Sequence, residues 1–206
     1  MKIKVCGMRD PENIKAIAAH APDYVGLILY DKSPRFAGEI DPKALQALPE
    51  ETKRVGVFVN AGMRYIREQA ERYKLDTIQL HGDETPDFCE SLRRDYTVIK
   101  AFGIEKSHDL DYALQYEGTC DYFLFDAKTP KRGGAGVKFD HSVLKKYTGN
   151  TPYFLSGGIG PEDAQAITAL DDERCIAVDI NSRFETKPGL KDAVVAGRFI
   201  NEIRNA

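Results

Sequence analysis

Eight short apolar runs alternate with eight segments of helical character along the 206 residues of this chain. The runs are rich in β-branched and aromatic residues, which is typical of buried strands. They lie at Ile3–Cys6, Tyr24–Leu29, Arg54–Val59, Thr77–Leu80, Val98–Phe102, Tyr122–Phe125, Tyr153–Leu155 and Ile176–Ile180. The predicted helices lie at Pro11–His20, Pro42–Leu48, Met63–Tyr73, Thr85–Arg94, His108–Tyr116, His141–Tyr147, Pro161–Leu170 and Ala193–Asn205.

This alternation favours a parallel sheet, because parallel strands need long crossover connections of the kind that a helix supplies. Eight such units leave little of the chain for a second domain. We therefore predict an α/β fold in which residues 1–206 form a single-domain, eight-stranded parallel β/α (TIM) barrel. A doubly wound open sheet is the alternative, but its dinucleotide fingerprint should follow the first strand, where the chain reads CGMRDPEN instead.

In a β/α barrel, the residues that end each strand line one face, and enzymes of this architecture place their sites there. Reactive residue types gather at this register, namely a thiol, an acid, a histidine, a cation and two turns suited to phosphate. These are Cys6, Arg35, Asn60, His81, Asp126, the pair Gly157-Gly158 and the pair Asn181-Ser182.

The stretch PYFLSGGIGPED joins a strand to a helix start through three glycines. Gly157 and Gly158 carry no Cβ that would block close approach of a ligand, and the helix start adds free N–H groups with a positive dipole end. These features predict a phosphate site, with an ordinary βα turn as the alternative. Ser182 and Arg183, which follow the eighth strand, can donate to the same phosphate.

Cys6 ends the first strand, so it lies at the predicted site and not in the middle of the core. A thiol there can act as a general base or nucleophile if nearby cations lower its pKa. We expect Arg35 and the phosphate-binding helix end to do this, and Cys6 to react quickly with iodoacetamide near neutral pH. The alternative is an inert buried cysteine.

Asp126 follows the apolar run YFLF, and desolvation by such neighbours raises the pKa of a carboxyl and makes it a usable general acid. The alternative is an aspartate that starts a loop or caps a helix. The loop that follows, residues 128–136, is long and rich in glycine and cations, so we expect it to serve the site.

Four further polar side chains complete the predicted site. Arg35, in a turn stiffened by proline, can clamp a carboxylate with two hydrogen bonds, although a solvated loop arginine is the alternative. His81 can act as an acid or a base, or be a structural histidine. Lys4 and Asp179 share the inward side of their strands, so they are candidates for an ion pair inside the barrel.

The composition argues against nucleic acid and membranes as partners of this protein and leaves a small molecule as the expected ligand. The formal net charge is −3, with basic residues dispersed among acids, which provides no basic face for nucleic acid and no polybasic membrane anchor. The four cysteines show neither a disulfide pattern nor metal-ligand spacing, and the first residues read as a strand instead of a signal peptide. We expect a cytoplasmic protein with no metal, whose ligand carries a phosphate.

The short motifs of the chain, taken together, resemble those of a known family. KVCGMRD, KSPRF, GVFVN, QLHGDE, FDA with GGAG, LSGGIGPED and VDINSRFE followed by PGLKD occur in this order, and together they resemble phosphoribosylanthranilate isomerase of tryptophan biosynthesis. The resemblance covers essentially the whole chain. It implies a β/α barrel that needs no cofactor and carries out an Amadori rearrangement of a phosphorylated substrate, as a monomer or a homodimer.

The resemblance also implies roles for individual residues. Cys6 matches the family's general base and Asp126 its general acid, while Arg35 matches the group that faces the anthranilate carboxylate. The phosphate-binding turns of the family match Gly157, Gly158 and Ser182, and we add His81 and Arg183 as substrate-binding candidates.

Two departures from the family pattern stand out. The chain reads Ser182-Arg183-Phe184-Glu185 where the family usually has Ser-Gly-Val-Glu, and it reads GGAG at residues 133–136 where the family has Gly-Gly-Thr-Gly. The second change removes only a hydroxyl. For the first, we expect the Arg183 guanidinium to reach inward to the phosphate.

The sequence alone is also compatible with two other functions. One is another sugar-phosphate isomerase or epimerase on the same barrel, although a metal-dependent version would need several converging His and Asp ligands, and only His81 of the four histidines is so placed. The other is a non-catalytic sugar-phosphate sensor, against which the retention of both Cys6 and Asp126 argues. Acceptance of a related aminoaldose from histidine biosynthesis is also left open.

Overall fold

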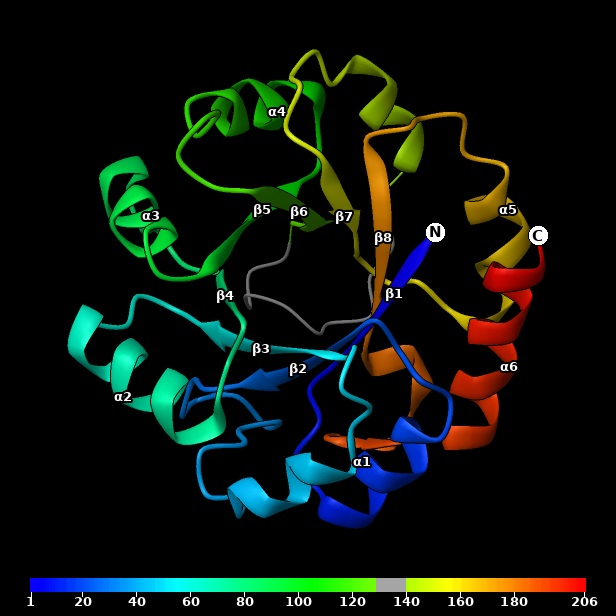
Figure 1. Ribbon diagram of the computed structural model, residues 1–206. Helices are drawn as coiled ribbons and strands as arrows, with labels where there is room; N and C mark the ends of the chain where they lie inside the picture. The colour runs from blue at the N-terminus through cyan, green and yellow to red at the C-terminus, as the bar shows by residue number, and fades with distance from the viewer. Residues whose placement is uncertain (129–139) are drawn as a thin grey trace.

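The computed structural model describes residues 1–128 and 140–206. Within these residues, eight parallel strands form a closed barrel in chain order (Figure 1). They are β1 (Lys2–Cys6), β2 (Tyr24–Ile28), β3 (Lys53–Phe58), β4 (Thr77–Leu80), β5 (Thr97–Ile104), β6 (Tyr122–Ala127), β7 (Tyr153–Leu155) and β8 (Cys175–Ile180). Pairing of β1 with β8 closes the ring and sets Lys4 opposite Asp179. The predicted barrel is confirmed, and the open-sheet alternative is wrong.

Helical segments follow the strands and surround the barrel (Figure 1). The α-helices are α1 (Pro11–Ala18), α2 (Met63–Tyr73), α3 (Pro86–Arg93), α4 (Ser107–Leu114), α5 (Ala164–Thr168) and α6 (Ala193–Asn205). The 3₁₀ segments that follow strands β2, β6 and β7 are η1 (Pro42–Ala47), η2 (His141–Lys146) and η3 (Pro161–Asp163). Each predicted helix therefore exists, but two of the predicted helices are 3₁₀ and the predicted helix Pro161–Leu170 is divided between η3 and α5.

Local sequence explains where several of these helices begin. The Asp10 side chain accepts a hydrogen bond from the Asn13 N–H at 2.9 Å, and Pro11 occupies the first turn of α1, where a missing N–H costs nothing. Thr85 caps α3 in the same way. The 3₁₀ segment η1 ends with Leu48 in extended backbone immediately before Pro49, because a proline disfavours helical geometry in the residue that precedes it.

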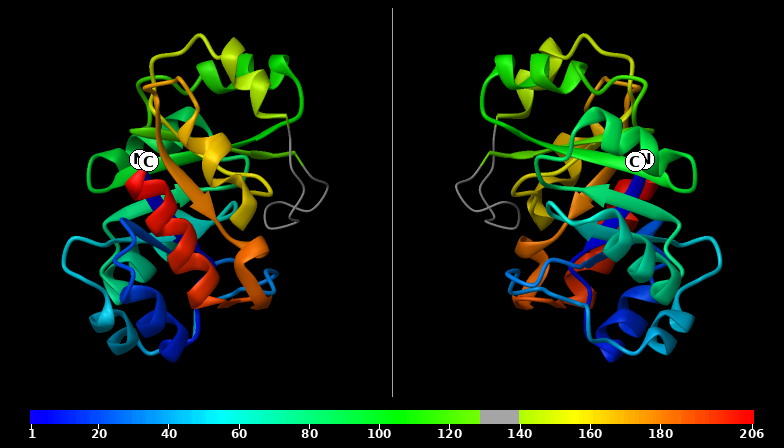
Figure 2. Two further views of the ribbon diagram at one scale, coloured as in Figure 1. Left: turned by 90° about the vertical axis from the view of Figure 1, so that its right-hand side faces the viewer. Right: turned by 90° about the vertical axis from the view of Figure 1, so that its left-hand side faces the viewer.

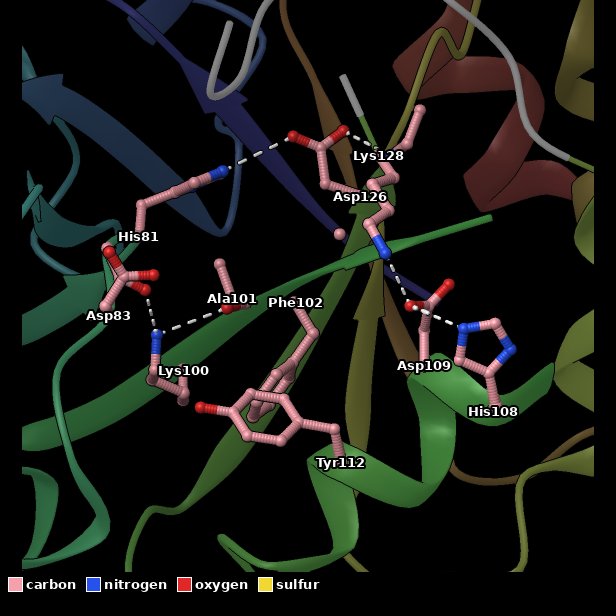
Figure 3. A pocket seen from close by; sticks show the side chains of 13 residues that line it. His81, Asp83, Lys100, Ala101, Phe102, His108, Asp109, Tyr112, Asp126 and Lys128 are labelled. Carbon is pink, nitrogen blue, oxygen red and sulfur yellow. Dashed lines mark hydrogen bonds and ion pairs between the residues drawn. The ribbon is translucent and has the colours of Figure 1, made fainter. Parts of the chain in front are cut away.

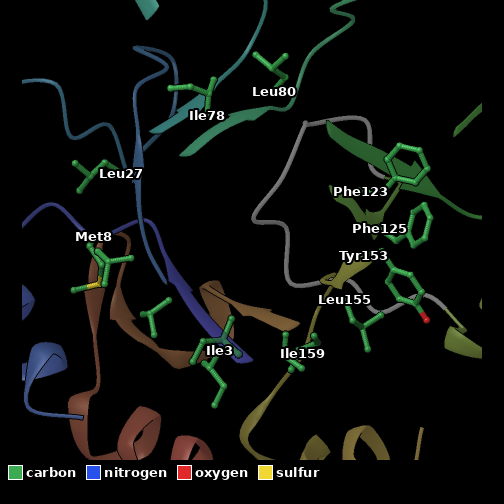
Figure 4. Packing of buried hydrophobic residues seen from close by; sticks show 14 of the residues in the cluster. Ile3, Met8, Leu27, Ile78, Leu80, Phe123, Phe125, Tyr153, Leu155 and Ile159 are labelled. Atoms are coloured by element: carbon green, nitrogen blue, oxygen red, sulfur yellow. The ribbon is translucent and has the colours of Figure 1, made fainter. Parts of the chain in front are cut away.

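Two apolar layers follow from the alternation of side chains along each strand. Residues that point outward pack between the strands and the helices, and Ile3, Leu80 and Phe123 are fully buried there (Figure 4). Residues that point inward form a smaller cluster, to which Val55, Leu124 and Phe154 belong. The barrel interior is therefore a packed core and not a channel.

Beyond β8 the chain forms a short segment that the strand and helix pattern did not predict. The 3₁₀ turn η4 (Ser182–Phe184) leads into an antiparallel hairpin of β9 (Glu185–Lys187) and β10 (Leu190–Lys191). The hairpin lies at one end of the barrel and both chain termini lie at the other (Figure 2). In the described part of the chain, no helix is long and apolar enough to cross a membrane.

Candidate active site

The carboxyl ends of the strands bring the predicted reactive residues to one end of the barrel. Cys6 ends β1, Asp126 lies near the end of β6, and His81 directly follows β4. The glycine turn follows β7, and Ser182 begins η4 after β8. Residues that are distant in the sequence therefore share one end of the barrel, as the sequence predicted.

Cys6 is buried in the barrel interior, with 4% of its surface exposed. Burial raises the pKa of the Cys6 thiol, and the charge of Asp179 raises it further, while Lys4 and Lys191 oppose the shift. The expectation that the pKa of Cys6 is lowered by Arg35 and a helix end is therefore wrong. The reason is desolvation combined with a carboxylate that offsets the nearest cation.

Lys4 and Asp179 form the ion pair that their shared inward position predicted. Lys4 Nζ donates to Asp179 Oδ1 at 2.8 Å, and the two side chains are 0% and 6% exposed. The pKa of Asp179 is raised, chiefly by burial, although the charge of Lys4 lowers it. Asp126 raises this pKa and His81 lowers it by smaller amounts. Asp179 therefore connects Cys6 and Lys4 electrostatically with Asp126 on β6.

Asp126 and His81 form a second polar pair (Figure 3). Nε2 of His81 lies 3.4 Å from Asp126 Oδ2, and Asp126 Oδ1 accepts the Ala127 N–H at 2.8 Å. The other nitrogen of His81, Nδ1, lies 2.9 Å from Gln79 Nε2, which fixes the orientation of the ring. Among these bonds, Oδ2 has only the long contact with His81.

A pocket of about 440 Å³ opens beside Asp126, between β5, β6 and α4 (Figure 3). Its lining includes Phe102 and Tyr112 as apolar wall and Lys128 at its rim. Lys128 Nζ donates to Asp109 Oδ1 at 2.8 Å. Burial alone would raise the pKa of Asp109, but Lys128 and the backbone N–H groups of residues 105 and 106 lower it to about 2. The pocket therefore offers an aromatic wall next to an acid.

Arg35 is buried, so it is not the solvated loop arginine of the alternative. Its Nε and Nη2 donate to the Glu185 carboxylate at 2.9 and 2.7 Å, and Lys191 Nζ donates to the same carboxylate at 2.6 Å. Burial would raise the pKa of Glu185, but these two cations hold it below its ordinary value. Gly7, at φ 77°, allows this packing, since a Cβ there would lie 2.9 Å from both Arg35 Cδ and Asn181 Oδ1.

The glycine turn after β7 has the backbone that a phosphate site needs. Gly157 and Gly158 have φ values of 91° and 67°, a region that residues with a Cβ rarely adopt. The Gly160 N–H is bonded to Asp163 Oδ2 at 2.7 Å. Among the hydrogen bonds recorded for the described residues, none uses the N–H of Gly157 or Gly158. Their N–H groups can therefore bind an anion.

Arg183 pairs with an acidic side chain of the neighbouring turn, and its contact with a phosphate stays a prediction. Its Nη2 donates to Glu162 Oε1 at 2.6 Å, and the side chains of the pair are 39% and 54% exposed. Because Glu162 belongs to η3 and Arg183 to η4, this pair joins the two predicted phosphate turns at the rim.

The strand-end reasoning missed Gln79, Glu185 and Lys191. Gln79 was visible as an inward residue two positions before His81. Glu185 and Lys191 lie in the motifs VDINSRFE and PGLKD, but strand-end reasoning passed over them because the hairpin that carries them was not predicted. The Gly133–Gly136 motif lies outside the described residues. Within the described ranges, no group of three or more His, Cys, Asp or Glu side chains is arranged to hold a metal ion.

Comparisons with known proteins agree with this geometry. The family model described as N-(5'phosphoribosyl)anthranilate (PRA) isomerase matches residues 3–202. A relative from Parabacteroides distasonis named N-(5'-phosphoribosyl)anthranilate isomerase is 48% identical, over 98% of this chain and 93% of the relative.

Two solved structures are similar along the whole chain. The phosphoribosyl anthranilate isomerase of Thermus thermophilus has a TM-score of 0.88 at 30% identity and covers 100% of this chain and 99% of its own. A second phosphoribosyl anthranilate isomerase, in complex with reduced 1-(o-carboxyphenylamino)-1-deoxyribulose 5-phosphate, has a TM-score of 0.82 at 30% identity and full coverage of both chains.

Proposed function

The chain belongs to the N-(5'-phosphoribosyl)anthranilate isomerase family, and we propose that it performs the family's reaction with Cys6 as general base and Asp126 as general acid. It is an isomerase of tryptophan biosynthesis that converts N-(5'-phosphoribosyl)anthranilate into 1-(2-carboxyphenylamino)-1-deoxyribulose 5-phosphate. We further propose that residues 1–206 form one catalytic domain and that the reaction takes place in the cytoplasm, where four unpaired cysteines stay reduced.

The reaction needs one acid and one base. Asp126 gives its proton to the ribose ring oxygen, the bond between that oxygen and C1′ breaks, and the nitrogen lone pair forms an iminium. Cys6, as thiolate, then takes the proton from C2′. The electrons of that C–H bond form the C1′–C2′ double bond, and those of the iminium return to nitrogen. The resulting enolamine becomes the ketone when its 2′-hydroxyl loses a proton and C1′ gains one.

Neighbouring groups support these two roles. Nε2 of His81 lies 3.4 Å from the Asp126 carboxylate, so it can help to hold the carboxyl group in position. Lys4 stands beside Cys6 and favours the thiolate. Acid and base therefore have different electrostatic surroundings, which a reaction with opposite proton transfers at two atoms requires.

The remaining site residues bind the substrate. We assign the phosphate to the N–H groups of Gly157 and Gly158 together with Ser182, because a dianion is stabilised by free backbone donors. We assign the anthranilate carboxylate to Arg35, whose Nη1 is not used in its bonds to Glu185. His81 contributes through Asp126. Arg183, which is held by Glu162, has at most a secondary role.

One observation carries the proposal: a thiol from β1, a carboxyl from β6 and a glycine turn after β7 meet at the same end of a closed barrel. The test is turnover of freshly prepared phosphoribosylanthranilate, followed by the loss of its anthranilate-type fluorescence in a buffer without added metal. We expect decay much faster than the uncatalysed background. Decay at the background rate would show that the chain does not catalyse this reaction.

A further inference from the structure

Lys4 is a buried charged group that the reaction as described does not need to touch. Its side chain is fully enclosed in the barrel interior, 0% exposed. A buried ammonium is costly unless it is paired, and the only salt bridge recorded for it among the described residues is the one to Asp179 at 2.8 Å. A lysine in this position therefore calls for an explanation beyond packing.

The fold places the Lys4 ammonium beside the Cys6 sulfur. Both residues point inward from β1, since they are two positions apart on one strand. Their polar atoms lie over the same residue of β2: a Cβ built on Gly26 would be 2.9 Å from Cys6 Sγ and 3.3 Å from Lys4 Nζ. Gly26 thus leaves the space that both atoms occupy, and the Lys4 charge favours the thiolate form of Cys6.

The charges that face this cluster are few within the described residues. Lys4 reaches Cys6 from its own strand, Asp179 from β8 and Lys191 from β10. The neighbouring strand β2 contributes Gly26 and, in the same interior cluster, the uncharged Tyr24. Asp179 is faced in turn by Asp126 and His81. Lys191 is bound to Asn181 and Glu185 at 2.8 and 2.6 Å, so most of its charge is already balanced. Lys4 is therefore the strongest cation acting on the thiol.

We propose that Lys4 is a positioning residue of the isomerase: its ammonium, held in place by Asp179, is the counter-ion that favours the anionic form of the Cys6 sulfur, beside Gly26, before the sulfur takes the substrate proton. The proposal rests on the proposed function only in naming Cys6 as the base. Asp179 has a double effect, because it fixes the ammonium but also repels the thiolate.

This arrangement predicts opposite effects for the two partners of one ion pair. Replacing Lys4 removes the attraction that favours the thiolate, so Cys6 should ionise at higher pH. Replacing Asp179 removes a repulsion and leaves the ammonium, so Cys6 should ionise at lower pH. A role limited to stabilising the barrel would not do this, because either substitution breaks the same salt bridge and would act in the same direction.

The experiment measures ionisation of Cys6 without substrate. Wild-type protein and the variants Lys4→Met and Asp179→Asn are treated with iodoacetamide between pH 6 and about 10.5, a range around the ordinary thiol pKa, and labelling of the Cys6 peptide is quantified by mass spectrometry. We expect the midpoint to rise by at least about one pH unit in Lys4→Met and to fall in Asp179→Asn. The pH profile of kcat/KM should move in the same directions.

A double variant and a matched control keep the result interpretable. Lys4→Met with Asp179→Asn leaves neither partner of the ion pair unpaired. Because Lys4 acts on the thiol more strongly than Asp179, the midpoint should still rise, by less than in Lys4→Met, and this holds even if Lys4→Met alone folds poorly. Lys100→Met serves as the control, because Lys100 is equally buried and pairs with Glu84 at 3.2 Å but is absent from the groups that act on Cys6. It should leave the Cys6 midpoint unchanged.

Shifts of the same sign for the two single variants, or no shift in folded Lys4→Met protein, would overturn the role of Lys4. A correct sign pattern combined with full activity of Cys6→Ala would instead leave the electrostatic pairing intact and remove Cys6 as the base. The two failures are therefore distinguishable.

Discussion

Arg35 and Glu185 are 150 residues apart in the chain, and Nε and Nη2 of the arginine both donate to the glutamate carboxylate, at 2.9 and 2.7 Å. The pair ties the loop after β2 to the hairpin after β8. It also means that the arginine assigned to the substrate carboxylate already holds a carboxylate from its own chain. Arg35 is therefore oriented before any ligand arrives, but two of its three guanidinium nitrogens already donate to Glu185.

Replacing Glu185 by glutamine should destabilise the protein strongly. The change leaves Arg35 and Lys191, whose side chains are 10% and 0% exposed, without their shared counter-charge. Breaking a buried pair in this way typically costs about 3–5 kcal/mol of unfolding free energy. Urea unfolding measures it, and Glu162→Gln is the control, because its exposed pair with Arg183 should contribute at most about 1 kcal/mol. Equal losses in the two variants would contradict this prediction.

Ionisation of Glu185 should also make the free energy of unfolding decrease at acid pH. Its pKa is held below the ordinary value of 4.5, so its ionised form adds stability that is fully present above about pH 4.5. That stability is lost as the pH falls through the lower folded pKa. The difference in unfolding free energy between wild type and Glu185→Gln should therefore shrink below pH 4.5, as measured by urea titrations from pH 7 to pH 3. A difference that stays constant would argue against the ionised carboxylate as its source.

Cys6→Ala and Asp126→Asn should each reduce kcat by about 10²- to 10⁴-fold, with KM changed only modestly. Both groups act on proton transfers in the transition state more than on binding of the substrate. Steady-state kinetics with phosphoribosylanthranilate measure both constants, and circular dichroism verifies folding. If either variant stays within a few-fold of wild type, that residue is not the acid or base.

Arg183→Gly should raise KM by no more than about fivefold, because the exposed pair with Glu162 limits the contribution of the arginine to roughly 1 kcal/mol or less. Glu162→Gln frees the guanidinium and should leave KM unchanged or lower it. KM values measured at low and high salt provide the comparison, since screening weakens any contact of Arg183 with the phosphate. A tenfold or larger rise in Arg183→Gly at low salt would show that Arg183 swings inward when substrate binds.

Much of the candidate site followed from where apolar runs stop. Cys6 and Asp126 could be located because each ends a strand-like run, and strand ends of a parallel barrel meet at one face. Lys4 and Asp179 could be paired because inward and outward positions alternate with a period of two. Both rules depend only on residues that are close together in the sequence, so they can be applied without knowing how the barrel closes. The closed barrel itself followed from the eightfold repeat of strand and helix.

Tertiary structure alone decided the partners of Arg35, Arg183 and Lys191 and the direction of the Cys6 pKa. The partner Glu185 is set by a hairpin packed on distant loops, and whether Arg183 meets Glu162 or a ligand depends on how two turns approach each other. The pKa of Cys6 is the balance between desolvation and charges on three strands, and of these charges only Lys4 is a neighbour of Cys6 in the sequence. The sequence therefore determined which groups gather at the barrel end, whereas closure of the ring determined their contacts and fields, because Coulomb and burial energies depend on distances in space and not along the chain.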